Sequence, residues 1–191
     1  MLGVQLNSFY YRSMKNPLRL LLTLGFIGVL TYGIHLFSQS QDVAKESTLS
    51  GKKVTLPGEL LDTDGNEVLL DELKGKYIGL YFSASWCGPC RTFTPKLVQF
   101  RDQNEENFEV VLVGSDGSAK AQANYMKKYK MPWLALKNQS DEARELSLSL
   151  DVEYIPYLIV LDPDGNVVTK SGKQDISRLG SEAFSSWVQK K

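Results

Sequence analysis

Two cysteines separated by two residues stand where an apolar run meets a helical pattern. Cys87 and Cys90 are the only cysteines of the chain, and the run YIGLYFS at 77–83 precedes them. A compact apolar run of this kind is typical of a central strand. From Cys90 to about Gln103 the apolar side chains recur at helical spacing. We therefore expect a strand that leads directly into the cysteines and a helix that follows them.

This placement gives the pair its chemistry. Three residues apart on a helix, the two sulfur atoms face the same side and can close a small disulfide. The unpaired N–H groups and the macrodipole at a helix N-terminus favour the thiolate form of Cys87. Cys87 is thus predicted to attack a partner disulfide, and Cys90 to resolve the mixed disulfide. Gly88 lets a substrate backbone approach, and Pro89 suits the first helical turn.

Other kinds of cysteine site fit less well. A structural zinc needs four ligands, and a copper-delivery site would want a histidine. The one histidine is His35, so residues 53–191 offer two cysteines and no histidine. We expect no metal, and no cofactor other than the redox-active disulfide. The alternative is an inert structural disulfide, although it would close only a tiny loop and constrain little.

The rest of the chain alternates between strand and helix patterns. Strands are expected at 54–61, 67–70, 77–83, 108–114, 157–161 and 166–169, and helices at 90–103, 119–129 and 141–150. A last helix, carrying Leu179, Ala183 and Trp187, should be capped by Asp175. Asp64-Gly65 predicts an N-terminal β-hairpin, and Asp164-Gly165 predicts a turn between the last two strands. Helices between the central strands make those strands parallel, and the final hairpin adds an antiparallel edge. The prediction is an α/β fold with a mixed sheet and helices on both faces.

The N-terminal region predicts a membrane anchor. Residues 20–37 form an apolar stretch of 18 residues without Asp, Glu, Lys or Arg. As a helix it would span about 27 Å, close to a hydrocarbon core of about 30 Å. We expect a basic segment at 1–19, a transmembrane anchor at 20–37, a polar linker at 38–52 and one domain at 53–191. A cleaved signal peptide, which would leave a secreted protein, is the alternative.

The charge distribution bears on location and partners. Three basic residues and no acid precede the apolar stretch: Arg12, Lys15 and Arg19. Because positive charge stays inside, the domain should lie on the extracytoplasmic side, periplasmic or lumenal. The rest of the chain carries all 22 acidic residues and the other 19 basic ones. A mildly acidic domain has no electrostatic reason to bind nucleic acid.

Several motifs resemble the thioredoxin superfamily. WCGPC at 86–90 after an apolar strand resembles the thioredoxin signature, and Ile155-Pro156 stands before the strand YLIVL where thioredoxins carry a cis-proline. Pro95 matches the helix-kinking proline of the family. The segments 81–97, 131–136 and 155–165 are similar to the tryparedoxin and nucleoredoxin branch.

The resemblance implies a thioredoxin fold over about residues 53–190. It implies that Pro156 is cis and packs against the cysteine pair, and that the backbone of Ile155 pairs with a substrate strand. Trp86, Gly88 and Pro89 would lie on the same substrate-binding surface. Core packing is the role we expect for Trp133.

The chain also departs from the family. Tyr81 stands where thioredoxins have a buried acid, which leaves the proton acceptor for Cys90 to another group or to water. Tyr157 follows the proline where threonine is frequent, which changes the surface beside Cys87. Tryparedoxins usually have two prolines between the cysteines, whereas Gly88 precedes a single proline here, as in thioredoxin.

These observations predict a membrane-anchored thiol–disulfide oxidoreductase that reduces protein disulfides. It would draw electrons from a membrane or soluble donor, and we expect a monomer. One alternative is the reverse direction, in a disulfide oxidase or isomerase. Another is a non-catalytic module that senses redox state by binding a partner.

Overall fold

The computed structural model of the chain describes residues 52–189. The strands are β1 (Glu59–Leu61), β2 (Glu67–Leu69), β3 (Tyr77–Ser83), β4 (Phe108–Gly114), β5 (Leu134–Ala135), β6 (Tyr157–Leu161) and β7 (Val167–Thr169). The helices are η1 (Leu70–Leu73), α3 (Gly88–Asp102), α4 (Ala119–Lys128), α5 (Asp141–Ser149), α6 (Gly172–Leu179), η2 (Gly180–Glu182) and α7 (Ala183–Val188). The predicted basic segment, membrane anchor and linker up to residue 51 lie outside this range. Between residues 52 and 189, no helix has the length and apolar character needed to cross a bilayer.

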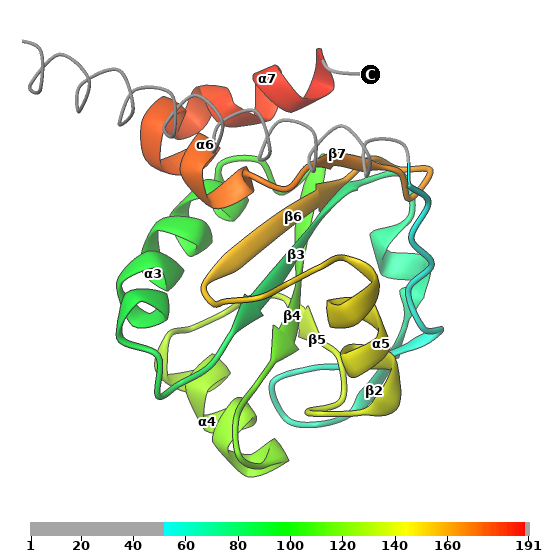
Figure 1. The fold of residues 1–191 in the computed structure, drawn as a ribbon, viewed down its shortest axis with the longest axis vertical. Helices are drawn as coiled ribbons and strands as arrows, with labels where there is room; N and C mark the ends of the chain where they lie inside the picture. Colours follow the sequence, from blue (N-terminus) through cyan, green and yellow to red (C-terminus); the bar gives the residue numbers. More distant parts are fainter. Residues whose placement is uncertain (1–51, 190–191) are drawn as a thin grey trace, which may run out of the picture. The chain divides into compact units, whose positions relative to one another are not determined.

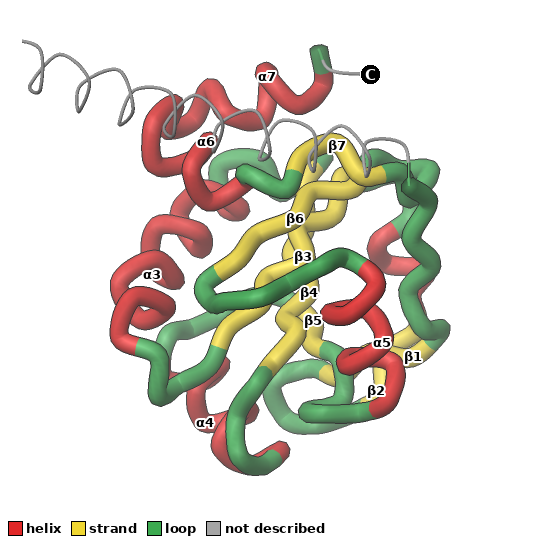
Figure 2. Tube along the Cα trace, in the orientation of Figure 1, coloured by secondary structure: helices red, strands yellow, loops and turns green. Residues whose placement is uncertain are grey.

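The seven strands form one mixed sheet, in the order β2-β1-β5-β4-β3-β6-β7. The pairs β3–β4 and β4–β5 are parallel, whereas β6 runs antiparallel to β3 and β7 antiparallel to β6. Figure 1 shows the sheet with α3 and α5 on opposite sides, and Figure 2 traces the same path by element type. The predicted mixed sheet, parallel centre and antiparallel final hairpin are confirmed.

Helices cover both faces of the sheet, so its central strands are buried on both sides. All seven residues of β3 and all seven of β4 are buried. Alternate residues enter two separate cores: Tyr81 packs with side chains of α3, α4, α6 and α7, whereas Leu80 packs with side chains of η1 and α5. Packing is tight at Gly79, where a Cβ atom would lie 2.8 Å from Cζ of Phe108. The bounds predicted for β3, β4 and β6 are those observed.

Two hairpin turns share the sequence pattern Asp-x-Asp-Gly-Asn. In each, the first aspartate accepts hydrogen bonds from the amides two and four residues later, at 2.8 and 2.9 Å for Asp62 and at 2.9 and 2.8 Å for Asp162. The glycines Gly65 and Gly165 both have φ of 86°, which favours glycine. Both predicted turns are confirmed, and the first strand is shorter than expected because pairing with β2 begins only at Glu59.

Two sequence predictions were wrong in detail. The helix after the cysteines begins at Gly88 and not at Cys90, because the Sγ atom of Cys87 already serves as its N-cap. The last helix is broken: α6 ends at Leu179, and Gly180, with φ of 56°, begins η2, which leads into α7.

Asp175 does not cap a helix. It lies within α6 and is buried, and its Oδ2 accepts a hydrogen bond from Nε1 of Trp187 at 2.9 Å and one from Oγ1 of Thr169 at 3.3 Å. The carboxylate therefore joins α6 to α7 and to the end of β7.

Candidate active site

The two cysteines form a disulfide at the start of α3, with their Cα atoms 5.2 Å apart. Cys87 is the N-cap residue, and its Sγ accepts a hydrogen bond from the backbone N–H of Cys90 at 3.2 Å. A serine, threonine or aspartate oxygen usually fills this place, so sulfur here acts as the helix cap. The free amides and macrodipole of the helix end favour negative charge on that atom once the disulfide is reduced.

The two sulfur positions differ in accessibility. Cys87 is 6% exposed and Cys90 is fully buried. The residues around Cys87, namely Trp86, Gly88 and Pro89, are exposed. A molecule that approaches the surface meets Cys87 first, which is the arrangement that a nucleophile at 87 and a resolving thiol at 90 require.

Strand pairing explains why a second segment meets the disulfide. Strands β3 and β6 are antiparallel neighbours, with Phe82 opposite Tyr157. The residues that follow β3 therefore lie at the same end of the sheet as the residues that precede β6.

This second segment is Ile155-Pro156, whose peptide bond is cis, as the resemblance implied. Pro156 is buried, and Ile155 packs against Cys87 and Cys90. The Sγ of Cys87 lies 3.9 Å from the carbonyl oxygen of Ile155. Tyr157 follows Pro156, at the position where threonine is frequent in the family. This tyrosine is half-buried.

A third segment, the loop after β4, holds the residues just before Cys87 in place. Oδ1 of Asp116 accepts hydrogen bonds from the backbone N–H of Ser85 at 3.0 Å and from its Oγ at 2.5 Å. The carbonyl oxygen of Ser115 accepts one from Nε1 of Trp86 at 3.1 Å. Asp116 is fully buried, and its Oδ2 has no hydrogen-bond partner among the described residues.

Sequence reasoning missed Asp116, although a signal was present. Parallel strands end at the same edge of a sheet, so a polar residue just after β4 had to lie near the end of β3. The observed register, with Ser83 opposite Gly114, fixes that relation.

Tyr81, at the position of the family's buried acid, belongs to a buried chain of hydroxyl groups. Its hydroxyl lies 3.2 Å from the carbonyl oxygen of Cys90 and 2.9 Å from Oγ1 of Thr94. Thr94 contacts the hydroxyl of Tyr125 at 2.7 Å, which contacts Oγ of Ser83 at 3.0 Å. Burial, and next the nearby Tyr125, raise the pKa of Tyr81 far above its ordinary value. The phenol of Tyr81 therefore keeps its own proton, is neutral and cannot act as a proton acceptor.

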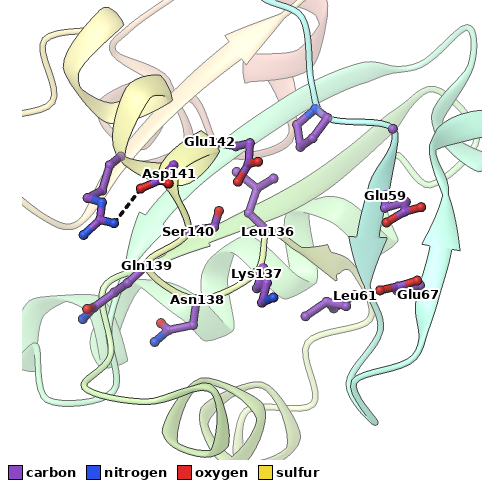
Figure 3. A pocket seen from close by; sticks show the side chains of 13 residues that line it. Glu59, Leu61, Glu67, Leu136, Lys137, Asn138, Gln139, Ser140, Asp141 and Glu142 are labelled. Carbon is purple, nitrogen blue, oxygen red and sulfur yellow. Dashed lines mark hydrogen bonds and ion pairs between the residues drawn. The ribbon is translucent and has the colours of Figure 1, made fainter.

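The structure also has a polar hollow away from the disulfide, with a volume of about 720 Å³. It lies between the β1–β2 hairpin and the start of α5, and Figure 3 shows the acids Glu59, Glu67, Asp141 and Glu142 on its walls. The pKa of Glu142 is lowered, mainly by a hydrogen bond with its own backbone amide and then by one with the side chain of Ser140. Within residues 52–189, no group of three His, Cys, Asp or Glu side chains could hold a metal ion.

Trp133 is buried and packs edge-on against Tyr81, with ring centroids 6.4 Å apart. The expected core-packing role of Trp133 is confirmed. Pro95 lies inside α3, at the place that the resemblance implied.

Comparison with known proteins agrees with this geometry. The thioredoxin-like family model matches residues 75–167. Tryparedoxin of Trypanosoma brucei brucei is 44% identical over 125 residues, which cover 63% of this chain and 85% of that protein. A probable nucleoredoxin 1 of Arabidopsis thaliana is 40% identical over 128 residues, 65% of this chain. The match spans only 22% of that nucleoredoxin, which is a much longer protein.

Solved structures give the same result. A tryparedoxin from Trypanosoma brucei superimposes with a TM-score of 0.62 at 40% identity, over 69% of this chain and 94% of that structure. The described domain thus has the thioredoxin fold, with a Cys-x-x-Cys pair at its usual place. The chain belongs to the thioredoxin-like family, and tryparedoxins and nucleoredoxins are among its homologues.

Proposed function

We propose that this chain reduces disulfides in partner proteins by exchange with the Cys87–Cys90 pair. One observation carries the proposal: the sulfur that caps α3 is the one nearer the surface, and the sulfur one turn later is fully buried. Family membership supports redox activity in general, and the uncharged Gly-Pro between the cysteines, which thioredoxin shares, supports the reducing direction.

The exchange balances in two steps. The thiolate of Cys87 attacks one sulfur of the partner disulfide; a Cys87–partner bond forms, and the other partner sulfur leaves as a thiolate and takes a proton. Cys90 then loses its proton and attacks Sγ of Cys87, which releases the second partner thiol. Two electrons and two protons have passed to the partner, and a dithiol donor must reduce the Cys87–Cys90 disulfide again.

Capture of a partner tests the proposal. In the full-length chain, Cys90→Ser should hold a protein disulfide substrate such as insulin as a mixed disulfide on residue 87, and Cys87→Ser should hold none. Thr92→Ser, an exposed change on the same helix, serves as the matched control and should behave as the wild type. Failure of the Cys90→Ser variant to form any mixed disulfide would overturn the proposal and favour a binding module.

The reduction potential tests the direction. A reductase of this type should have a potential close to that of thioredoxin, about −270 mV. A potential near about −120 mV, typical of a strong oxidant, would reverse the proposed direction of exchange.

We further propose that residues 20–37 anchor the domain at a membrane, on the extracytoplasmic side. Support comes from the length and apolar character of the stretch and from the basic residues before it. The full chain should stay in the membrane fraction after carbonate extraction, and Ile27→Asp should release it, because an acid at the centre of a span costs about 2.5–3.5 kcal/mol. Release of the unaltered chain by carbonate, or a shortened mature chain in the soluble fraction, would contradict the anchor.

A further inference from the structure

Each of the two segments that meet at the disulfide carries an exposed aromatic residue. Five large hydrophobic side chains are exposed between residues 52 and 189: Leu69, Trp86, Leu148, Tyr154 and Val188. Two of these five directly precede the two residues that meet at the site, since Trp86 precedes Cys87 and Tyr154 precedes Ile155. Trp86 is 63% exposed and Tyr154 is 57% exposed. Each of the two segments that meet at the disulfide therefore has an exposed aromatic residue directly before its contact residue.

Both rings are held in place. The indole N–H of Trp86 donates to the carbonyl oxygen of Ser115 at 3.1 Å. The ring of Tyr154 stands edge-on to that of Tyr157, with centroids 5.2 Å apart and an interplanar angle of 89°. Rings that are already ordered lose little conformational entropy when a partner covers them.

The two segments that meet at the disulfide, residues 86–90 and 154–157, have no charged side chain of their own. Residues 86–89 read Trp-Cys-Gly-Pro, and residues 154–157 read Tyr-Ile-Pro-Tyr. The next charged residues in sequence are Glu153 and Arg91, and the guanidinium of Arg91 lies 4.0 Å from the place that a Cβ atom of Gly88 would take. Exposed aromatic rings on both segments fit an apolar segment of a protein, because its binding removes their apolar surface from water.

We propose that the Tyr154–Tyr157 pair binds an aromatic or large aliphatic side chain that lies within two residues of the target cysteine in an extended protein segment. The proposal rests on the proposed function and names the substrate class of the same site. Tyr154 acts as a specificity-determining residue. Its exposed ring stacks on the partner's side chain, and the edge-on contact with Tyr157 keeps that ring in position.

The chemical step is unchanged by this contact. Sγ of Cys87 bonds to the partner sulfur, the partner disulfide breaks, and its other sulfur leaves as a thiolate that takes a proton. Cys90 then closes the Cys87–Cys90 disulfide, and the partner gains two electrons. The contact raises the rate by holding the partner disulfide at Cys87.

Single-turnover kinetics test the proposal. The pre-reduced full-length protein is mixed with disulfide-linked peptide dimers that differ only in one residue beside the cysteine, tyrosine or serine, and released thiol is measured. The wild type should reduce the tyrosine peptide at least about fivefold faster, in line with one aromatic contact. Tyr154→Ser should lower this preference below about twofold, and Tyr154→Phe, which retains the ring, should keep it.

Two controls isolate the contact. Leu69→Ser removes a side chain of similar exposure (66%) on β2, four strands from β3, and should leave the preference intact. Hydroxyethyl disulfide, which has no side chain to bind, should react equally with the wild type and with Leu69→Ser.

The outcomes separate the two proposals. An equal rate for both peptides, a full preference in Tyr154→Ser, or a faster reaction with glutathione disulfide than with either peptide overturns the inference and leaves the reductase activity standing. If the wild type itself did not reduce hydroxyethyl disulfide, both the proposed function and the inference would be overturned.

Discussion

The phenol oxygen of Tyr81 lies 3.2 Å from the carbonyl oxygen of Cys90, on the buried side of the active-site helix. The same hydroxyl contacts Oγ1 of Thr94, one turn further along α3. Where the family usually has a carboxylate, this chain thus has a neutral group that is bonded to the helix backbone. We expect Tyr81 to hold the backbone of Cys90 in position, and the proton of Cys90 to pass to another group.

Replacement of Tyr81 by phenylalanine separates these two roles. Tyr81→Phe should change the rate of disulfide reduction by less than about threefold and leave the pH–rate profile in place, because no proton acceptor is lost. It should lower the free energy of unfolding by about 1 kcal/mol through the lost hydrogen bonds. A rate loss of about a hundredfold, with a shifted pH profile, would show instead that Tyr81 handles the proton.

Alkaline pH should destabilise the fold through the same residue. Burial raises the pKa of Tyr81 above its ordinary value of 10.0, so above pH 10 the unfolded chain releases the proton that the folded chain keeps. Stability contributed by Tyr81 is therefore complete below pH 10 and is lost as the pH rises, by up to about 1.4 kcal/mol per pH unit. Denaturant titrations between pH 9 and 11 should show a steeper loss for the wild type than for Tyr81→Phe; equal slopes would contradict the shift.

Asp116 should matter for both stability and rate. Asp116→Ala leaves the backbone N–H and the hydroxyl of Ser85 without their acceptor, which should cost about 1–3 kcal/mol of unfolding free energy. Because Ser85 lies two residues before Cys87, we also expect a several-fold slower exchange with insulin. Glu106→Ala, at an exposed acid, is the matched control and should stay within about 0.5 kcal/mol of the wild type. Equal stability of the two variants would contradict this role.

Asp175 should be required for docking of the last helix. Asp175→Ala leaves the buried indole N–H of Trp187 without an acceptor, so the free energy of unfolding should fall by about 1–3 kcal/mol, and tryptophan fluorescence should change. Arg178 also contacts Asp175, at 3.7 Å, but its side chain is exposed. Arg178→Ala should therefore cost less than about 1 kcal/mol, and a cost equal to that of Asp175→Ala would point to the ion pair instead.

The sequence predicted the longer apolar strands well and the shortest strand not at all. The bounds of β3, β4 and β6 were correct because each is a continuous apolar run buried on both faces. β5 was missed because it consists only of Leu134 and Ala135, and tertiary pairing with β1 and β4 creates it. Two residues carry no periodicity that a sequence pattern could reveal.

The cysteine pair could be predicted from residues close to it in sequence. The side chains around it, in contrast, are positioned by contacts between residues far apart in sequence. The Cys-x-x-Cys spacing and the helix start are local features and could be found from neighbouring residues. The clamp from Asp116 to Ser85 spans 31 residues, and the bond from Asp175 to Trp187 depends on how two helices dock. The general preference of aspartate for helix N-caps predicted Asp175 as a cap, whereas its carboxylate binds the indole N–H of Trp187.

Cys87 lies four residues after Ser83, the last residue of β3. β3 lies between β4 and β6 and is buried along its whole length, so its amides should exchange with solvent only when the whole domain unfolds. The disulfide thus lies close to a strand that we expect to open slowly. Thermal motion of β3 should therefore change the position of the disulfide little. The partner protein must supply the flexibility, so disulfides in mobile or partly unfolded segments should react before those in rigid, well-packed ones.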